Sequence, residues 1–225
     1  MGATGVILDE AERLMARRAW REAHALCLRA LEADGAAARP RFLLGVIAAE
    51  HGNIGKAAEL FADAVKLEPG VARHHAQLAR CLIALNRQDE ARAAADRAAA
   101  LEARDALTQD TLGVVYSRSG LHARALPYFE RAVALRPGDA GFQQNLGTAL
   151  QFAGDFAGAE RALRAAVAVQ PDLYRAWWSL TQMSALRPDD EDRARLEALF
   201  PAAPDADPDR ALHIGHALAR LAEEA

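Results

Sequence analysis

Apolar and polar positions follow one another along this chain with the spacing of amphipathic helices. In residues 41–69, apolar residues fall three or four positions apart in two runs of about a dozen residues, one on each side of Gly52. The residues that separate such runs are Gly52, Asn86, Gly120 and Gly154. Glycine and asparagine suit the left-handed turn that ends a helix, so the pattern predicts pairs of antiparallel helices joined by tight turns.

The predicted helix pairs repeat with a period of thirty-four residues. A leucine followed by a small residue recurs at Leu44-Gly45, Leu78-Ala79, Leu112-Gly113, Leu146-Gly147 and Leu180-Thr181. Two alanine slots recur as Ala57, Ala91, Ala125 and Ala159 and as Ala64, Ala98, Ala132 and Ala166, with Phe61, Phe129 or Leu163 between them. A small residue at a helix crossing lets a side chain of the neighbouring helix fill the space. The period therefore predicts a stack of repeated two-helix elements.

The spacing of these slots resembles the tetratricopeptide repeat. Its complete form here is Leu112, Gly113, Tyr116, Ala125, Phe129, Ala132 and Pro137. The resemblance implies an all-α fold, a right-handed α-solenoid of antiparallel two-helix repeats. By the register, the solenoid covers residues 4–207, with repeats at about 4–37, 38–71, 72–105, 106–139 and 140–173 and a divergent repeat at 174–207.

The last residues, 208–225, predict a helix that caps the solenoid or forms half of another repeat. Asp207 suits its N-cap and Pro208 its first position. We expect this helix to cover the divergent repeat with Leu212, Ile214, Gly215 and Leu218. We expect His213, Arg220, Glu223 and Glu224 to face water, because the end of a solenoid needs a polar outer surface.

Composition excludes several classes of function. A net charge of -4 gives no general attraction to nucleic acid, and no apolar run approaches the roughly 20 residues that span a membrane. The first residues show no basic segment followed by an apolar one, so a cytoplasmic location is the expectation. Cys27 and Cys81 occupy slots that are apolar in other repeats, which predicts buried thiols without a disulfide or metal role.

No group of residues has the spacing of a catalytic or metal site. His74 and His75 are adjacent, and His213 and His216 lack a neighbouring cysteine or glutamate, so all four are expected on the surface. The acidic run Asp189, Asp190, Glu191 and Asp192 follows Pro188, and we expect it to open a helix, where its charge interacts well with the helix dipole. The sequence thus predicts no enzyme activity, no metal and no cofactor.

The resemblance implies that the first helix of each repeat lines an inner groove that binds a protein or an extended peptide. The candidate groove residues are Arg73, Gln77, Arg80, Asp110, Arg118, Gln144, Asn145, Thr148, Gln151, Trp178 and Gln182. The three arginines favour an acidic ligand, since guanidinium pairs with carboxylates. Trp178 and Asn145 could add an aromatic anchor and an amide for a peptide backbone. The alternative for each polar residue is a solvated surface without a ligand.

A second resemblance leaves another function open. Residues 175–225, with Trp177 and Trp178 followed by an acidic helix and a helix of small and apolar residues, are similar to the junction that joins the repeats of tetratricopeptide-repeat sulfotransferases to their catalytic domain. This resemblance implies a substrate-positioning arm whose catalytic domain is absent from the 225 residues. The two candidate functions are therefore a protein-binding scaffold and the repeat arm of a transferase.

Overall fold

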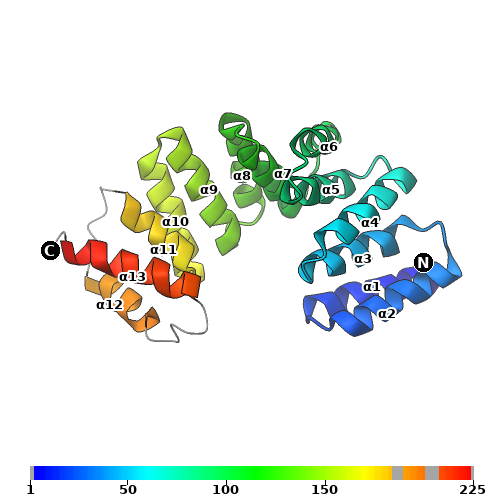
Figure 1. Ribbon diagram of the computed structural model, residues 1–225, viewed down its shortest axis with the longest axis horizontal. Coiled ribbons are helices and arrows are strands. Elements are labelled where there is room, and N and C mark those ends of the chain that lie inside the picture. Colours follow the sequence, from blue (N-terminus) through cyan, green and yellow to red (C-terminus); the bar gives the residue numbers. More distant parts are fainter. Residues whose placement is uncertain (1–2, 184–189, 201–207, 224–225) are drawn as a thin grey trace. The chain divides into compact units, whose positions relative to one another are not determined.

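The computed structural model describes residues 3–183, 190–200 and 208–223, and all regular structure in these ranges is α-helical, as predicted (Figure 1). The thirteen helices formed by the described residues are α1 (Ala3–Ala16), α2 (Trp20–Ala33), α3 (Ala38–Glu50), α4 (Ile54–Leu67), α5 (Ala72–Ala84), α6 (Gln88–Ala100), α7 (Ala106–Arg118), α8 (His122–Leu135), α9 (Ala140–Ala153), α10 (Phe156–Val169), α11 (Tyr174–Gln182), α12 (Asp190–Leu199) and α13 (Pro208–Glu223). None of them is long and apolar enough to cross a membrane, within the part of the chain that is described.

The chain divides into two compact units. The N-terminal unit is residues 1–121 and holds α1–α7, and the C-terminal unit is residues 122–225 and holds α8–α13. In the N-terminal unit α1 packs on α2, α3 on α4 and α5 on α6, while α7 lies against α5 and α6. In the C-terminal unit α9 contacts α8 and α10, and α11 contacts α10 and α13. This stepwise packing of neighbours along the chain is that of an all-α repeat solenoid.

The recurring small residues lie where neighbouring helices come closest. A Cβ atom added to Gly45 of α3 would lie 2.7 Å from Cε1 of Phe61 in α4, and one added to Gly147 of α9 would lie 2.6 Å from Cγ of Leu163 in α10. Every alanine of the two predicted slots is fully buried. The packing confirms that these slots hold small residues because a larger side chain from the next helix occupies the space.

The predicted left-handed turns are also confirmed. The φ angles are 76° at Gly52, 60° at Asn86, 76° at Gly120 and 81° at Gly154. Arg18, which stands thirty-four residues before Gly52, has a φ angle of 58°. The first repeat therefore makes the same turn without a glycine or asparagine. The sequence did not predict this turn, because arginine does not favour a left-handed conformation.

A side-chain hydrogen bond that the sequence analysis missed recurs at the start of five helices. At positions thirty-four residues apart, a side-chain nitrogen donates to the backbone carbonyl six residues earlier in the chain. The donors are Arg41, His75, Gln109, Gln143 and Trp177, and the acceptors are the carbonyls of Gly35, Pro69, Ala103, Pro137 and Pro171. Each bond fixes the loop between two repeats to the helix that follows it.

The last helix begins at Pro208 as predicted and packs on α11 and α12, while the predicted cap Asp207 lies outside the described residues. The prediction of its buried face is partly wrong. Ile214 is 1% exposed and Leu218 packs against the same core, but Leu212 is 56% exposed. His213, which we expected to face water, contacts the rings of Tyr174 and Trp178 instead. The side chains of Arg220, Glu223 and Glu224 lie outside the described residues.

Candidate functional site

Five of the predicted groove residues lie on two neighbouring helices of the N-terminal unit. Arg73, Gln77 and Arg80 are on α5, and Asp110 and Arg118 are on α7, which packs against α5. Arg73 and Arg118 are exposed and Arg80 is half-buried. Gln77 and Asp110 are only 5% and 9% exposed, so little of either side chain is accessible to a ligand. The three arginines form the accessible part of this surface, which we call the arginine surface.

The geometry keeps these guanidinium groups available. Arg73 and Arg80 are seven residues apart on α5, which places them on one face of the helix about 10 Å from each other. The guanidinium of Arg73 lies 4.9 Å from the centre of the Phe42 ring, a cation-π contact that holds it in place. Arg73, Arg80 and Arg118 form no ion pair with any described residue. By contrast, Arg39 pairs with both Asp9 and Glu12.

The other predicted groove residues lie in the C-terminal unit. Gln144, Asn145, Thr148 and Gln151 are half-buried along α9. Thr148 donates from Oγ1 to the carbonyl of Gln144 at 3.0 Å within its own helix. Gln151 donates from Nε2 to the carbonyl of Ser179 in α11 at 3.2 Å, so its amide joins two helices of the solenoid.

Trp178 and Gln182 complete the predicted set on α11. Gln182 is exposed, whereas Trp178 is half-buried. The indole of Trp178 has its centre 5.5 Å from the ring centres of both His213 and His216 on α13, with nearly perpendicular ring planes. Trp178 is therefore already packed against α13, and only part of its ring faces solvent.

Two of the four histidines expected on the surface are buried. His74 is 0% exposed and His75 is 3% exposed. His75 is buried because its Nε2 serves as one of the recurring loop donors, 2.8 Å from the carbonyl of Pro69. The ring of His74 packs against that of Phe42 with the ring centres 4.9 Å apart and the planes tilted by 33°, and neither of its ring nitrogens has a hydrogen-bond partner among the described residues. Burial, together with the charge of Arg73, lowers the pKa of His74 to about 4, so the ring is neutral at pH 7.

The remaining candidate chemistry is structural. Cys27 and Cys81 are buried and unbridged as predicted, and burial raises the pKa of the Cys27 thiol to about 11. Of the acidic run, Asp192 is buried and pairs with Arg164 of α10 at 3.0 Å, while α12 begins at Asp190 as expected. Among the described residues, no group of three or more His, Cys, Asp or Glu side chains could hold a metal ion.

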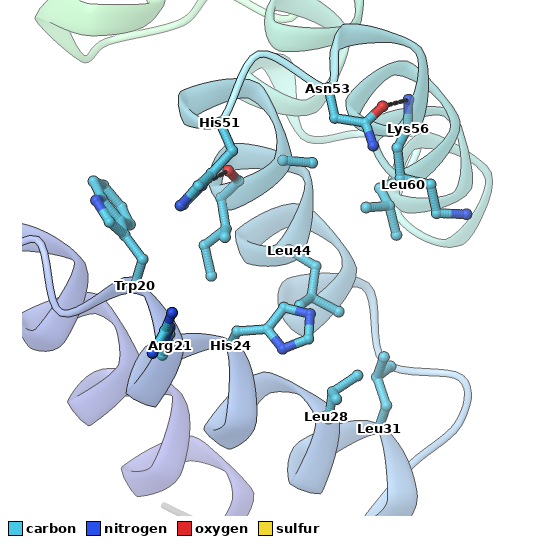
Figure 2. A pocket seen from close by; sticks show the side chains of 12 residues that line it. Trp20, Arg21, His24, Leu28, Leu31, Leu44, His51, Asn53, Lys56 and Leu60 are labelled. Carbon is cyan, nitrogen blue, oxygen red and sulfur yellow. Dashed lines mark hydrogen bonds between the residues drawn. The ribbon is translucent and has the colours of Figure 1, made fainter.

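A pocket of about 730 Å³ lies in the N-terminal unit between α2, α3 and α4 (Figure 2). The sequence pattern did not predict this pocket, because the predicted groove involves only the first helix of each repeat. One signal was present: Leu28 of α2 lines the pocket at a slot that holds Ala62, Asp96, Glu130 and Arg164 in the later repeats. An exposed leucine at a slot that is otherwise small or charged marks an apolar surface.

Comparison with protein families finds the tetratricopeptide repeat along most of the chain. One family model described as tetratricopeptide repeat matches residues 48–112 and 118–184, and a second with the same description matches residues 8–72. A comparison with curated proteins gives no significant match.

Solved structures share the fold at low sequence identity. PilF of Pseudomonas aeruginosa is 18% identical with a TM-score of 0.72, over 96% of this chain and 97% of that chain. A chain in the crystal structure of the APC/C hetero-tetramer Cut9-Hcn1 is 17% identical with a TM-score of 0.79, over 96% of this chain and 43% of that chain. YrrB, described as a TPR protein with an unusual peptide-binding site, is 21% identical with a TM-score of 0.58, over 84% of this chain and 97% of that chain.

Proposed function

We propose that this chain, which belongs to the tetratricopeptide-repeat family, is a non-catalytic scaffold that binds a protein or an extended peptide. The fold supports this proposal because stacked helix pairs present extended surfaces built from many separate side chains. YrrB, which shares the fold, is a TPR protein with a peptide-binding site, and this likeness supports the same class of ligand.

The observation that carries the proposal is the arginine surface. Three guanidinium groups on the packed helices α5 and α7 have no carboxylate partner among the described residues, in a chain whose net charge is -4. Guanidinium groups pair with carboxylates in a bidentate geometry that a solvated lysine does not reproduce. We therefore propose an acidic segment as the ligand of this surface. Electrostatic attraction would also raise the association rate of the acidic segment, and added salt would reduce this gain in rate.

The residues of the C-terminal unit extend the proposal to a peptide backbone. Gln144 and Gln182 carry amides that can both donate to and accept from an extended chain, and the accessible part of Trp178 offers an apolar contact. Gln151 and Thr148 contribute less, because their donors already bond to backbone carbonyls.

Peptide titration tests the proposal. We would measure the affinity of an extended glutamate-rich peptide, and of the same peptide with glutamine in place of glutamate, for the wild type and for the triple variant Arg73→Ala, Arg80→Ala, Arg118→Ala. The control is the triple variant Arg29→Ala, Arg97→Ala, Arg104→Ala, which removes the same charge from exposed arginines of the N-terminal unit.

We expect the glutamate peptide to bind the wild type and the control variant with equal affinity. It should bind the triple variant of the arginine surface at least about tenfold more weakly, because each lost pairing with a charged group costs about 1 kcal/mol or more. The difference should shrink at high salt. The arginine surface would be rejected as the binding site if its triple variant and the control variant bound the glutamate peptide equally. Equal affinity of the wild type for the glutamate and glutamine peptides would reject it too.

The second candidate function, the repeat arm of a tetratricopeptide-repeat sulfotransferase, stays a prediction from sequence resemblance. It rests on residues 175–225, and neither the family match nor the structural relatives described above add support to it.

A further inference from the structure

The pocket between α2, α3 and α4, which we call the α2–α4 pocket, is an open apolar trough. Its walls are α2 and α4, and α3 forms its floor (Figure 2). Leu31, Leu44, Ile47 and Leu60 supply apolar surface inside it, and Leu28, which is 44% exposed, stands at its edge. Together these residues form a contiguous apolar surface, and a contiguous exposed apolar surface marks a site that another molecule covers.

This pocket does not belong to the predicted groove. A shift of thirty-four residues from Arg73 and Arg80 leads to Arg39 and Val46, the inner positions of α3. At 100° per residue, Ile47 lies about a quarter of a turn and Leu44 nearly half a turn around the helix from those positions, and both line the pocket. A ligand in the α2–α4 pocket therefore uses another face of α3 than a ligand in the groove.

Cationic side chains line the pocket on both α2 and α4. Arg21 lies at the start of α2, where the ring centres of Trp20 and His51 are 5.9 Å apart, and Lys56 lies near the start of α4 beside Leu60, on the opposite side of the view (Figure 2). Arg21 forms no ion pair with a described residue, and Lys56 pairs only with the exposed Glu59 at 2.9 Å. No aspartate or glutamate lines the pocket, although the chain as a whole is negative.

We propose that the α2–α4 pocket binds an acidic amphipathic helix of a partner protein. Its apolar side chains would contact Leu28, Leu31 and Leu60, and its carboxylates would meet Arg21 on α2 or Lys56 on α4. Charge complementarity selects the acidic character of this partner. The site is independent of the arginine surface and of the function proposed for it.

The dimensions favour a helix over a small molecule. The lining residues of α2 run from Trp20 to Leu31, which is about 16 Å of helix, or three turns. That length matches apolar side chains at i, i+3, i+4 and i+7 of a helix lying in a groove. Small-molecule sites bury most of their ligand, whereas this trough leaves the edge residue Leu28 nearly half exposed.

The test uses a defined peptide and a site-specific signal. The probe is a synthetic amphipathic helix with leucines at i, i+3, i+4 and i+7 and glutamates in its first turn. In the wild type it should shift the indole N–H resonance of Trp20 and leave those of Trp177 and Trp178, which lie in the C-terminal unit, in place. The triple variant of the arginine surface should bind this probe as the wild type does, which separates the two sites.

Two variants have matched controls. Leu28→Asp should weaken binding at least about tenfold, since it removes an apolar contact of a leucine side chain. Leu67→Asp changes a leucine of α4 that is 41% exposed and lies outside the pocket, and it should leave the affinity for the probe unchanged. Arg21→Glu should weaken binding about fivefold, whereas Arg29→Glu on the same helix should leave it unchanged. A probe with lysine in place of glutamate should bind Arg21→Glu better than it binds the wild type.

Four outcomes would overturn the proposal. The first is a probe that leaves the Trp20 resonance in place, and the second is equal binding by Leu28→Asp and the wild type. The third is a shift of the Trp20 resonance that oleate causes and the helical probe does not, which would assign the pocket to a lipid. The fourth is a dimer of the wild type that Leu28→Asp abolishes in sedimentation equilibrium, which would assign the pocket to a second copy of this chain.

Discussion

His74 shows how the solenoid can bury a polar residue at a cost. Its ring is fully buried against Phe42, its nitrogens have no hydrogen-bond partner, and burial lowers its pKa to about 4. The charged groups that face it, Arg73 and His75, lower the pKa in the same direction. A histidine held neutral in the folded chain makes stability depend on pH below the ordinary pKa of the ring.

The sign of this dependence follows from the two pKa values. Above about pH 6.5 the ring is neutral in both states, whereas between pH 6.5 and pH 4 only the unfolded chain takes up the proton. The free energy of unfolding should therefore fall by about 1.4 kcal/mol per pH unit in this range, or about 3 kcal/mol in all. In urea titrations at pH 7.5 and pH 5, His74→Leu should lose less stability than the wild type. His24→Leu, at an exposed position, should lose as much as the wild type, and equal loss by all three proteins would show that His74 is protonated in the fold.

A second residue-scale prediction concerns the helix crossings. Gly45→Ala should lower the free energy of unfolding by about 1–3 kcal/mol, because the new Cβ would lie 2.7 Å from the Phe61 ring in a core that cannot expand freely. Gly55→Ala in α4, whose new Cβ meets no atom within 4 Å, should raise it by up to about 1 kcal/mol through helix propensity. Thermal unfolding of both variants checks this, and a stable Gly45→Ala would mean that α3 and α4 are further apart than the structure shows.

At the level of helices and loops, a side-chain hydrogen bond to the preceding loop recurs every thirty-four residues. This bond explains why the unlike residues Arg41, His75, Gln109, Gln143 and Trp177 occupy equivalent positions. Arginine, histidine, glutamine and tryptophan have little in common except a side-chain N–H that reaches the carbonyl six residues earlier. The sequence pattern of apolar and small residues could not reveal this feature, because the slot keeps a hydrogen-bond donor and not a residue type.

The bond of Gln143 can be tested against its neighbour in the same helix. Gln143→Leu removes the 3.0 Å hydrogen bond to the carbonyl of Pro137 and should lower the free energy of unfolding by about 1 kcal/mol. Gln144→Leu, at a half-buried position without such a bond, should change it by less than about 0.5 kcal/mol. Chemical denaturation measures both, and an equal effect of the two substitutions would deny the loop bond a role in stability.

The last helix shows what helical spacing alone leaves open. Its position followed from the period and its start from the helix-start residues Asp207 and Pro208, but the face it turns inward followed from neither. At 100° per residue, Leu212 lies about 160° from Ile214, so burial of Ile214 and Ala217 necessarily turns Leu212 outward. The same rotation brings His213 onto Trp178. Sequence pattern identifies an apolar face, whereas the neighbouring helices decide which residues at its border are covered.

At the scale of the whole molecule, the fold was predictable because the period is a global signal carried by many residues. Leu112, Ala125 and their counterparts agree on one register, and the structure and the family match confirm an all-α repeat solenoid. The candidate site was less predictable, since binding depends on individual accessible side chains. Gln77 and Asp110 shared the register of the arginines yet are buried, and the α2–α4 pocket involves second helices that the groove pattern does not describe.

In the proposed function, Arg73, Arg80 and Arg118 together bind an acidic segment. The most direct measurement follows the side-chain Nε–H resonances of the arginines by NMR while a glutamate-rich peptide is added to the full chain. We predict that the resonances of these three arginines shift with one common affinity, while those of the exposed Arg29, Arg97 and Arg104 stay in place. Shifts of equal size at all six arginines, or shifts confined to residues outside α5 and α7, would contradict the claim.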